Sequence, residues 1–374
     1  MEITHIAGAA RPPEDPYDVD IVILALDRVE DTIAAIESAW SQTGVSRHTI
    51  VLDQGSRPEN LERLAAFVRY RTDTTLVAAG CNLGVAAGRN AASAIGHGRA
   101  IVGLDNDALF HREDTLARMM AMFESHPGTA ALGCRIVVDD TGEDDLTSWG
   151  YPLSLLPRAG GTFLAATFVG AGHAIRRTAW EDAGGYDPAL FFCWEEYDFC
   201  LRAIARGWTI RYQGDIVIRH KVNPERRISW SGPRWFHFVR NRLYIERKKG
   251  RSWLSLTPRM AGYCVKALRN GCLRDTPGAI RAAIAMARGI VPDPLPHAAR
   301  DYLYRTDTAL RGGMLKRLRR EVFASLPGRH ATEASIRAIV SGGKGSALAA
   351  ATHSASSRRF LTPNTSVSIG SDSA

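Results

Sequence analysis

Two carboxylates separated by a single residue follow a short apolar segment near the middle of the chain. Residues 100–104 have the short, continuous apolar pattern of a buried strand, and Asp105, Asn106 and Asp107 come directly after them. Carboxylate oxygens are preferred ligands of Mg²⁺ and Mn²⁺, and these ions also bridge to phosphate groups. The pattern predicts a divalent-cation site. A solvated turn is the alternative, because Asp and Asn are common turn residues.

A second acidic cluster stands where a helix is expected to begin. Glu195, Glu196 and Asp198 follow Trp194, and the helical pattern runs to residue 206, before Gly207. The helix dipole favours acidic residues in a first turn, which gives the cluster a purely structural explanation. Repulsion among three carboxylates also raises the pKa of one of them towards the range of a general base. An indole beside carboxylates suits packing against the C–H groups of a sugar ring.

Two further segments are weaker candidates. His220 ends a predicted strand at residues 215–218, and a lone histidine matters only if the fold brings it to the acidic site. Residues 82–90 form a small-residue turn that enters a helix, where backbone N–H groups and Arg89 could meet a phosphate. Residues 170–175 resemble half a dinucleotide fingerprint, but they lack its third glycine, so a nicotinamide site is excluded.

The elements that must position these side chains alternate regularly up to about residue 128. Strands are expected at 19–26, 49–52, 76–78 and 100–104, with helices at 29–42, 58–70 and 84–97. This alternation predicts an α/β fold with a mainly parallel sheet flanked by helices. Ligands of such sheets bind beyond the carboxyl ends of the strands, which points to the surroundings of Asp53 and Asp105.

The alternation loosens in the second part of the chain. Strands are expected at 130–138, 162–169, 209–212 and 215–218, and a short helix at 178–184. Residues 139–161 form a long acidic connection, of a length that is often functional in compact domains. From residue 234 the pattern is helical and basic.

The charge is divided unevenly along the 374 residues. Residues 1–215 hold 18 Arg, no Lys and 30 acidic residues, a net charge of −12, whereas residues 216–320 hold 24 basic and 6 acidic residues, a net charge of +18. With 45% hydrophobic residues the chain can bury a large core. The sequence contains no run of 18 apolar residues, so a membrane-spanning helix is not expected. The absence of a secretory signal and of a Cys-x-x-Cys pair among six cysteines favours a cytoplasmic protein with reduced thiols.

Taken in order, these segments resemble the family 2 glycosyltransferases of the GT-A fold over about residues 19–250. The markers are the segments 19–26, 52–56, 82–90, 105–107, 184–187 and 194–202, followed by His220 and the helical segment 240–247. The Trp-acid-acid helix start is most similar to the bacterial rhamnosyltransferase and galactofuranosyltransferase branch. The resemblance implies inverting, metal-dependent transfer of a sugar from a nucleotide-diphosphate-sugar to an acceptor hydroxyl, in cell-surface polysaccharide or glycolipid synthesis.

The resemblance also implies a role for each candidate residue. Asp105 would contact the ribose or donor sugar and, with Asp107 and His220, bind Mg²⁺ or Mn²⁺. Glu196 would be the catalytic base. Supporting or contact roles would fall to Glu195 and Asp198 beside the base, Arg89 at the diphosphate, Asp53 and Gln54 near the nucleotide base, and Trp194 and Gly172 on the acceptor side. Gln54 stands where many members carry a second Asp that reads uracil, which leaves the nucleotide base open.

The resemblance and the composition together divide the chain into four expected parts. Residues 1–17 are expected to be a flexible lead-in, and 18–225 the catalytic domain, with a donor half at 18–107 and an acceptor half at 108–225. Residues 226–320 are expected to form a basic helical region, and 321–374 a helix and a Ser/Ala/Gly-rich tail that is disordered after about 340.

Two other functions remain open on the sequence alone. A sugar-phosphate nucleotidyltransferase would carry a Gly-rich basic loop after its first strand, where this chain has Asp27-Arg28-Val29-Glu30. The basic segment 216–320 would suit nucleic acid, although it contains no recognised nucleic-acid motif. It would equally suit an anionic membrane surface or a lipid-linked saccharide acceptor, with the protein peripheral at the inner face of the membrane. A solvated basic helical face is the third option.

Overall fold

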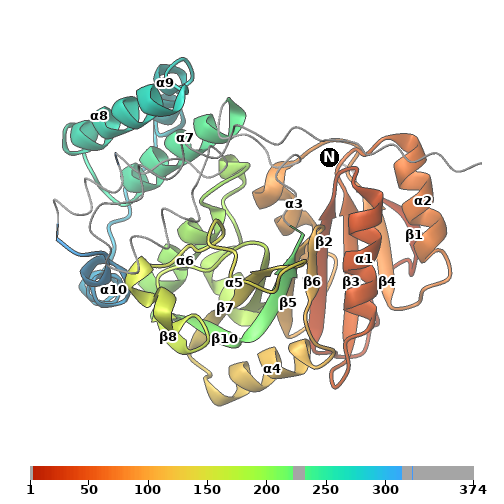
Figure 1. The fold of residues 1–374 in the computed structure, drawn as a ribbon. Helices are drawn as coiled ribbons and strands as arrows, with labels where there is room; N and C mark the ends of the chain where they lie inside the picture. Colours follow the sequence, from red (N-terminus) through yellow and green to blue (C-terminus); the bar gives the residue numbers. More distant parts are fainter. Residues whose placement is uncertain (1–2, 222–231, 314–321, 323–374) are drawn as a thin grey trace, which may run out of the picture.

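One large mixed sheet forms the centre of the molecule (Figure 1). The computed structural model describes residues 3–221, 232–313 and 322. Across these ranges the strands are β1 (Thr4–Gly8), β2 (Val19–Ala25), β3 (Arg47–Asp53), β4 (Thr74–Ala78), β5 (Ala100–Asp105), β6 (Ala108–Phe110), β7 (Thr129–Val138), β8 (Thr162–Ala165), β9 (Gly172–Arg176) and β10 (Thr209–His220). Their order in the sheet is β1-β4-β3-β2-β5-β9-β7-β10-β6, and β8 pairs with β10.

The donor half has the predicted parallel arrangement. Strands β4, β3, β2 and β5 are parallel neighbours, and Ala25 of β2 pairs with Asp53 of β3. On the other side of β2, Leu24 pairs with Asp105 of β5. The ends of these strands therefore place Asp53 and Asp105 on either side of β2, at the same edge of the sheet.

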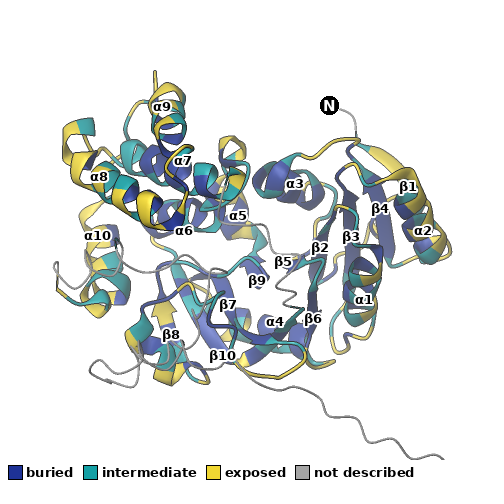
Figure 2. Ribbon diagram, turned by 45° about the horizontal axis from the view of Figure 1, so that its top comes forward, coloured by how far each residue is buried: buried dark blue, intermediate teal, exposed yellow. Residues whose placement is uncertain are grey.

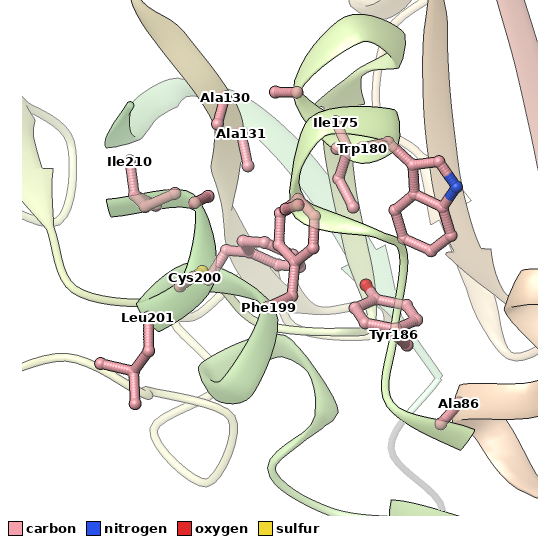
Figure 3. Close-up of a cluster of buried hydrophobic side chains, with 14 of the residues drawn as sticks. Ala86, Ala130, Ala131, Ile175, Trp180, Tyr186, Phe199, Cys200, Leu201 and Ile210 are labelled. Atoms are coloured by element: carbon pink, nitrogen blue, oxygen red, sulfur yellow. The ribbon is translucent and has the colours of Figure 1, made fainter. Parts of the chain in front are cut away.

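Helices cover both faces of this sheet. Apolar residues of α1 (Val29–Trp40), α2 (Pro58–Val68) and α4 (Thr115–Ser125) form one buried cluster with β2 residues Ile21 and Ile23. On the opposite face, α3 (Gly84–Ser93), α5 (Arg177–Ala183) and α6 (Glu195–Ala205) pack with Val22. Figure 3 shows part of this second cluster, in which Phe199 of α6 lies near Trp180 of α5 and Tyr186. The sheet is thus the middle layer of a three-layer α/β fold, as predicted.

A helical region follows the sheet. It contains α7 (Pro233–Lys248), α8 (Trp253–Asn270), α9 (Thr276–Met286) and α10 (His297–Leu303). The first three share a separate apolar core around Trp235, Leu256 and Tyr263, and Figure 1 shows them at one end of the molecule. In the described parts of the chain, no helix is both long and apolar enough to cross a membrane.

Three details differ from the sequence-based expectations, and a fourth expectation concerns residues that the structure does not describe. Residues 4–8 of the expected flexible lead-in form β1, which pairs antiparallel with β4 at the edge of the sheet. Residues 172–176, dismissed as a fingerprint, form β9, because Ala174 and Ile175 are needed in the core between β5 and β7. The two expected strands at 209–218 are one strand, β10, whose register shifts between Gln213 and Val217. The expected disorder after about residue 340 lies outside the described residues.

Candidate functional site

Asp107 lies between two cationic side chains. The residues that follow β5 turn back into β6, and β6 pairs with the end of β10, so that His220 lies opposite Ala108. As a result, His220 Nε2 is 3.5 Å from Asp107 Oδ1. On the other side, Arg28 donates a hydrogen bond to Asp107 Oδ2 at 2.7 Å. The topology therefore brings residues 28, 107 and 220 together from three separate segments.

The orientation of His220 is set by a carboxylate behind it. Its Nδ1 lies 3.0 Å from Oδ2 of the buried Asp145. Burial alone lowers the pKa of a histidine, but here Asp107 and Asp145 outweigh that effect and raise the pKa of His220 to about 10. Burial opposes ionisation of Asp107, yet His220 and Arg28 outweigh it and hold the pKa of Asp107 below its ordinary value.

Asp107 and His220 are suitable ligands for a divalent cation. Their facing oxygen and nitrogen are close enough to share one ion, and a histidine ligand typically has its other ring nitrogen held by a carboxylate, as Asp145 holds His220. Within the described ranges no three His, Cys, Asp or Glu side chains lie so that they could hold a metal ion together, so that Asp105 does not join Asp107 and His220 as a third ligand. Two protein ligands suffice where substrate phosphates and water complete the coordination of Mg²⁺.

Arg89 supports Asp105 from below the sheet edge. Its side chain is 3% exposed, donates to Asp105 Oδ1 at 2.9 Å and donates to the carbonyl oxygen of Val22 at 2.6 Å. The carboxylate of Asp105 is 43% exposed on its outer side. The guanidinium is therefore buried under Asp105, in contrast to the expectation that it faces a diphosphate directly, because helix α3 packs Arg89 against β2 and β5.

The end of β3 offers an acceptor for a ligand. Asp53 Oδ1 accepts hydrogen bonds from the backbone N–H groups of Gly55 and Ser56, which closes the turn after the strand. Its buried Oδ2 has no hydrogen-bond partner among the described residues. The side-chain oxygen of Gln54 already has a partner within the protein, because Oε1 accepts a hydrogen bond from the N–H of Leu83 at the start of α3. Asp53 thus fits recognition of a ligand N–H, whereas Gln54 joins two elements of the protein.

The first turn of α6 holds two carboxylates whose pKa is raised. Burial, together with the negative charge of Asp105, raises the pKa of Glu196 to about 7, although Arg89 opposes the shift. Burial and the neighbouring Glu196 raise the pKa of Glu195 well above its ordinary value. Gly170 lies directly against Glu196, since a Cβ there would overlap the Glu196 carboxylate. The interaction of both glutamates with Asp105 puts the two predicted acidic clusters in one electrostatic site.

Three expected site residues have other surroundings. Asp198 is fully buried and pairs with Arg202 of α6 and Lys248 of α7, which joins these two helices. Gly172 lies inside β9, where a Cβ would overlap Ile218, so that the position has no room for a side chain. Trp194 donates from Nε1 to the carbonyl oxygen of Phe238, and Arg242 lies 4.9 Å from its ring centroid.

A strained loop leads into α6. Phe191, Cys193 and Trp194 all have positive φ angles, of 62°, 71° and 75°, which non-glycine residues adopt at an energetic cost. Asn241 of α7 donates from Nδ2 to the carbonyl oxygens of residues 190, 192 and 193, each at 2.8 Å. Helix α7 therefore holds the backbone that positions Glu195 and Glu196.

The same loop caps helix α3. The carbonyl oxygen of Phe191 accepts hydrogen bonds from the N–H groups of Val85, at 2.6 Å, and Ala86, at 3.4 Å. These are N–H groups that the sequence suggested for phosphate binding. The protein's own chain therefore occupies that predicted phosphate cradle.

Several site residues were not found by sequence reasoning. Arg28 stands in a segment used only to exclude another enzyme class, and Asp145 lies within the acidic connection, whose length alone was the signal. Gly170 and Asn241 carry no chemical pattern of their own. Their positions become visible only when β9 and α7 are placed beside α6.

Part of the chain matches a known protein family. Residues 20–183 match the family model described as glycosyl transferase family 2. Over this segment the chain is therefore similar to the family 2 glycosyltransferases. The segment spans β2 to α5 and therefore includes Asp53, Asp105 and Asp107 but ends before α6.

One curated protein is similar to a part of this chain. Over 123 residues the chain is 33% identical to the succinoglycan biosynthesis protein ExoO of Rhizobium meliloti (strain 1021), a match that covers 33% of this chain and 33% of ExoO. The chain thus spans about a third of the length of that curated relative.

Two solved structures are also similar. The structure of GalNAc-T7 with UDP, GalNAc and Mn²⁺ has a TM-score of 0.53 at 13% identity, over 75% of this chain and 60% of that one. The mannosyltransferase PcManGT from Pyrobaculum calidifontis, in complex with GDP-Man and Mn²⁺, has a TM-score of 0.48 at 17% identity, over 86% and 90% of the two chains. The likeness to GalNAc-T7 supports a GT-A fold for this chain.

Proposed function

We propose that this protein is an inverting, metal-dependent glycosyltransferase that uses a nucleotide-diphosphate-sugar and an acceptor hydroxyl, in the synthesis of a cell-surface polysaccharide or glycolipid. The observation that carries the proposal is the electrostatic interaction of Glu196 with Asp105, next to the Asp107–His220 pair. A raised-pKa carboxylate beside a candidate diphosphate site is the arrangement that this reaction needs.

Asp107 and His220 would hold Mg²⁺ or Mn²⁺, with Asp105 at the donor ribose or sugar. When bound, the cation neutralises the negative charge that develops on the leaving nucleoside diphosphate. Arg89 keeps the Asp105 carboxylate in place, and Asp145 keeps His220 Nε2 directed at Asp107. Asp53 Oδ2 would accept a hydrogen bond from the nucleotide base.

Glu196 would remove the proton of the acceptor hydroxyl. The hydroxyl oxygen then forms a bond to the anomeric carbon while the bond from that carbon to the diphosphate oxygen breaks, and the proton stays on Glu196. A base with a pKa near neutrality combines a sufficient deprotonated fraction with sufficient basicity. Because attack and departure take place on opposite sides of the carbon, the configuration inverts.

The donor panel follows from the sequence resemblance. Nucleotide-linked rhamnose and galactofuranose are the first donors to test, because the Trp-acid-acid segment at the start of α6 resembles enzymes that use them. UDP- and GDP-linked hexoses complete the panel, since Gln54 leaves the nucleotide base open.

The deciding experiment measures sugar transfer and donor binding for Glu196→Gln. We expect transfer to fall by at least a hundredfold, the lower range of general-base contributions, while the donor still raises the melting temperature in the presence of Mn²⁺. The matched control is Glu181→Gln on the exposed surface of α5, which should retain full transfer. Near-normal transfer by Glu196→Gln would exclude this glutamate as the base, and absence of donor binding by the wild type across the whole panel would exclude the function.

A further inference from the structure

Helix α8 has two apolar stripes on opposite sides. One contains Leu256, Met260, Tyr263 and Ala267, and it packs into the core shared with α7 and α9. The other contains Leu254, Ala261, Val265 and Leu268, at steps of seven, four and three residues. With about 3.6 residues per turn, these four positions share one face of the helix, roughly opposite the buried stripe.

The second stripe is in contact with solvent. Leu254 is 81% exposed, Leu268 is 67% exposed and Val265 is 42% exposed. Figure 2 shows exposed residues along α8, which lies on the outside of the helical region. Single exposed apolar residues are common on protein surfaces, but an aligned apolar stripe indicates an interaction surface.

Basic residues accompany this stripe. Residues 251–288 contain seven Lys or Arg and one acid, Asp275. The exposed Arg269 borders the apolar stripe in the helical projection of α8, and the exposed Arg251 and Arg274 lie just before and just after this helix in the chain. An apolar face with a basic border is the pattern of helices that lie in the interface of an anionic membrane.

We propose that the outer face of α8 docks on the surface of a bilayer that contains anionic phospholipids, with Leu254, Val265 and Leu268 inserted among the headgroups. Charge separation within the chain favours this occupant, because residues 1–215 carry a net charge of −12 and would be repelled from the same surface. The bilayer would therefore orient the molecule so that the helical region of α7, α8 and α9 faces the lipid.

This surface is linked to the candidate catalytic loop. Helix α8 shares its core with α7, and Asn241 of α7 holds residues 190–193. Docking through α8 would thus place the acceptor side of the site near the lipid surface, where a lipid-linked saccharide would be presented. This last step rests on the proposed glycosyltransferase function, whereas the docking itself does not.

The test is flotation of the full chain with vesicles at about 0.15 M salt, the physiological range. We expect binding to phosphatidylcholine vesicles that contain 30% phosphatidylglycerol and little binding to phosphatidylcholine alone. The double variant Leu254→Asn, Leu268→Asn should lower the fraction bound to anionic vesicles by roughly tenfold or more, because two inserted apolar side chains are lost. Arg269→Gln should weaken binding less and reduce its salt dependence.

Tyr70→Asn provides the matched control, since Tyr70 is 89% exposed, lies beyond the end of α2 and is outside the docking face. Unchanged vesicle binding by the double variant, or equal binding to neutral vesicles, would overturn the proposal. So would a wild-type dimer that dissociates in the double variant without any vesicle binding, because the stripe would then be a subunit interface. Glu196→Gln should bind vesicles normally, so that failure of docking and failure of the catalytic assignment give different results.

Discussion

The backbone N–H of Val85 donates to the carbonyl oxygen of Phe191 at 2.6 Å, and this bond joins the donor half of the site to the acceptor half. Val85 belongs to the first turn of α3, and Phe191 belongs to the loop that precedes Glu195 and Glu196. Any change that separates them should displace the candidate base from the metal side of the site.

Gly84 tests this contact. Its φ is +74°, and a Cβ would overlap the carbonyl oxygen and ring of Phe191. Gly84→Ala should lower the free energy of unfolding by about 1–3 kcal/mol and should lower kcat more than it changes donor affinity. Thermal unfolding and a transfer assay measure the two effects. Gly128→Ala is the control, because nothing lies within 4 Å of the position that a Cβ would take at Gly128, and this variant should change neither quantity.

The raised pKa of Glu196 predicts a pH dependence. A catalytic base must be deprotonated, so kcat/KM should rise with pH and level off once the pH exceeds the pKa of Glu196, which is about 7. The sign follows from burial, which stabilises the neutral acid and moves the pKa upwards. A pH–rate profile whose acidic limb lies near pH 4.5, the ordinary range of a glutamate, would contradict the assignment.

Asn241 is predicted to be a positioning residue. Asn241→Leu removes a donor to the carbonyl oxygens of residues 190, 192 and 193, at a cost of about 1–3 kcal/mol for each group left unsatisfied. The carbonyl oxygen of Leu190 still accepts from Arg240. We expect kcat to fall while the KM for the donor changes little. Asn270→Leu also removes a buried helical amide, but from α8, so it should lower stability without lowering kcat. Equal kcat values for the two variants would assign Asn241 a purely structural role.

Asp145 is predicted to act on the metal through His220. Asp145→Asn should weaken the apparent affinity for Mn²⁺ roughly 10- to 100-fold, the usual range for carboxylates behind a ligating histidine. Mn²⁺ titration of transfer activity, together with Mn²⁺-dependent thermal stabilisation, measures this change. Asp144→Asn is the neighbouring control, since Asp144 pairs with Arg135 and does not contact the site. If both variants bind Mn²⁺ equally, Asp145 has no part in the metal site.

The sequence was most informative about residues whose position depends only on the element directly before them in the chain. The strands before Asp53 and Asp105 are short and continuously apolar, so the parallel donor half and its carboxyl edge were predictable. Contacts between distant segments were not. The pairing of β6 with β10, which brings His220 to Asp107, depends on a strand of three residues. The burial of Arg89 under Asp105 likewise depends on how α3 packs. The sequence pattern, an arginine after a glycine-rich turn, is equally compatible with an exposed side chain.

Lys248 sets a limit on how this chain can be divided. Its Nζ is 2.7 Å from Asp187 Oδ2 and 3.0 Å from Asp198 Oδ1, so the last turn of α7 neutralises two carboxylates that flank the catalytic loop. The boundary expected near residue 225 therefore runs between Lys248 and the two carboxylates with which it pairs. We expect a truncation before residue 248 to destabilise the segment that leads into α6, because the buried Asp198 would keep only Arg202 as an ion-pair partner in the described chain.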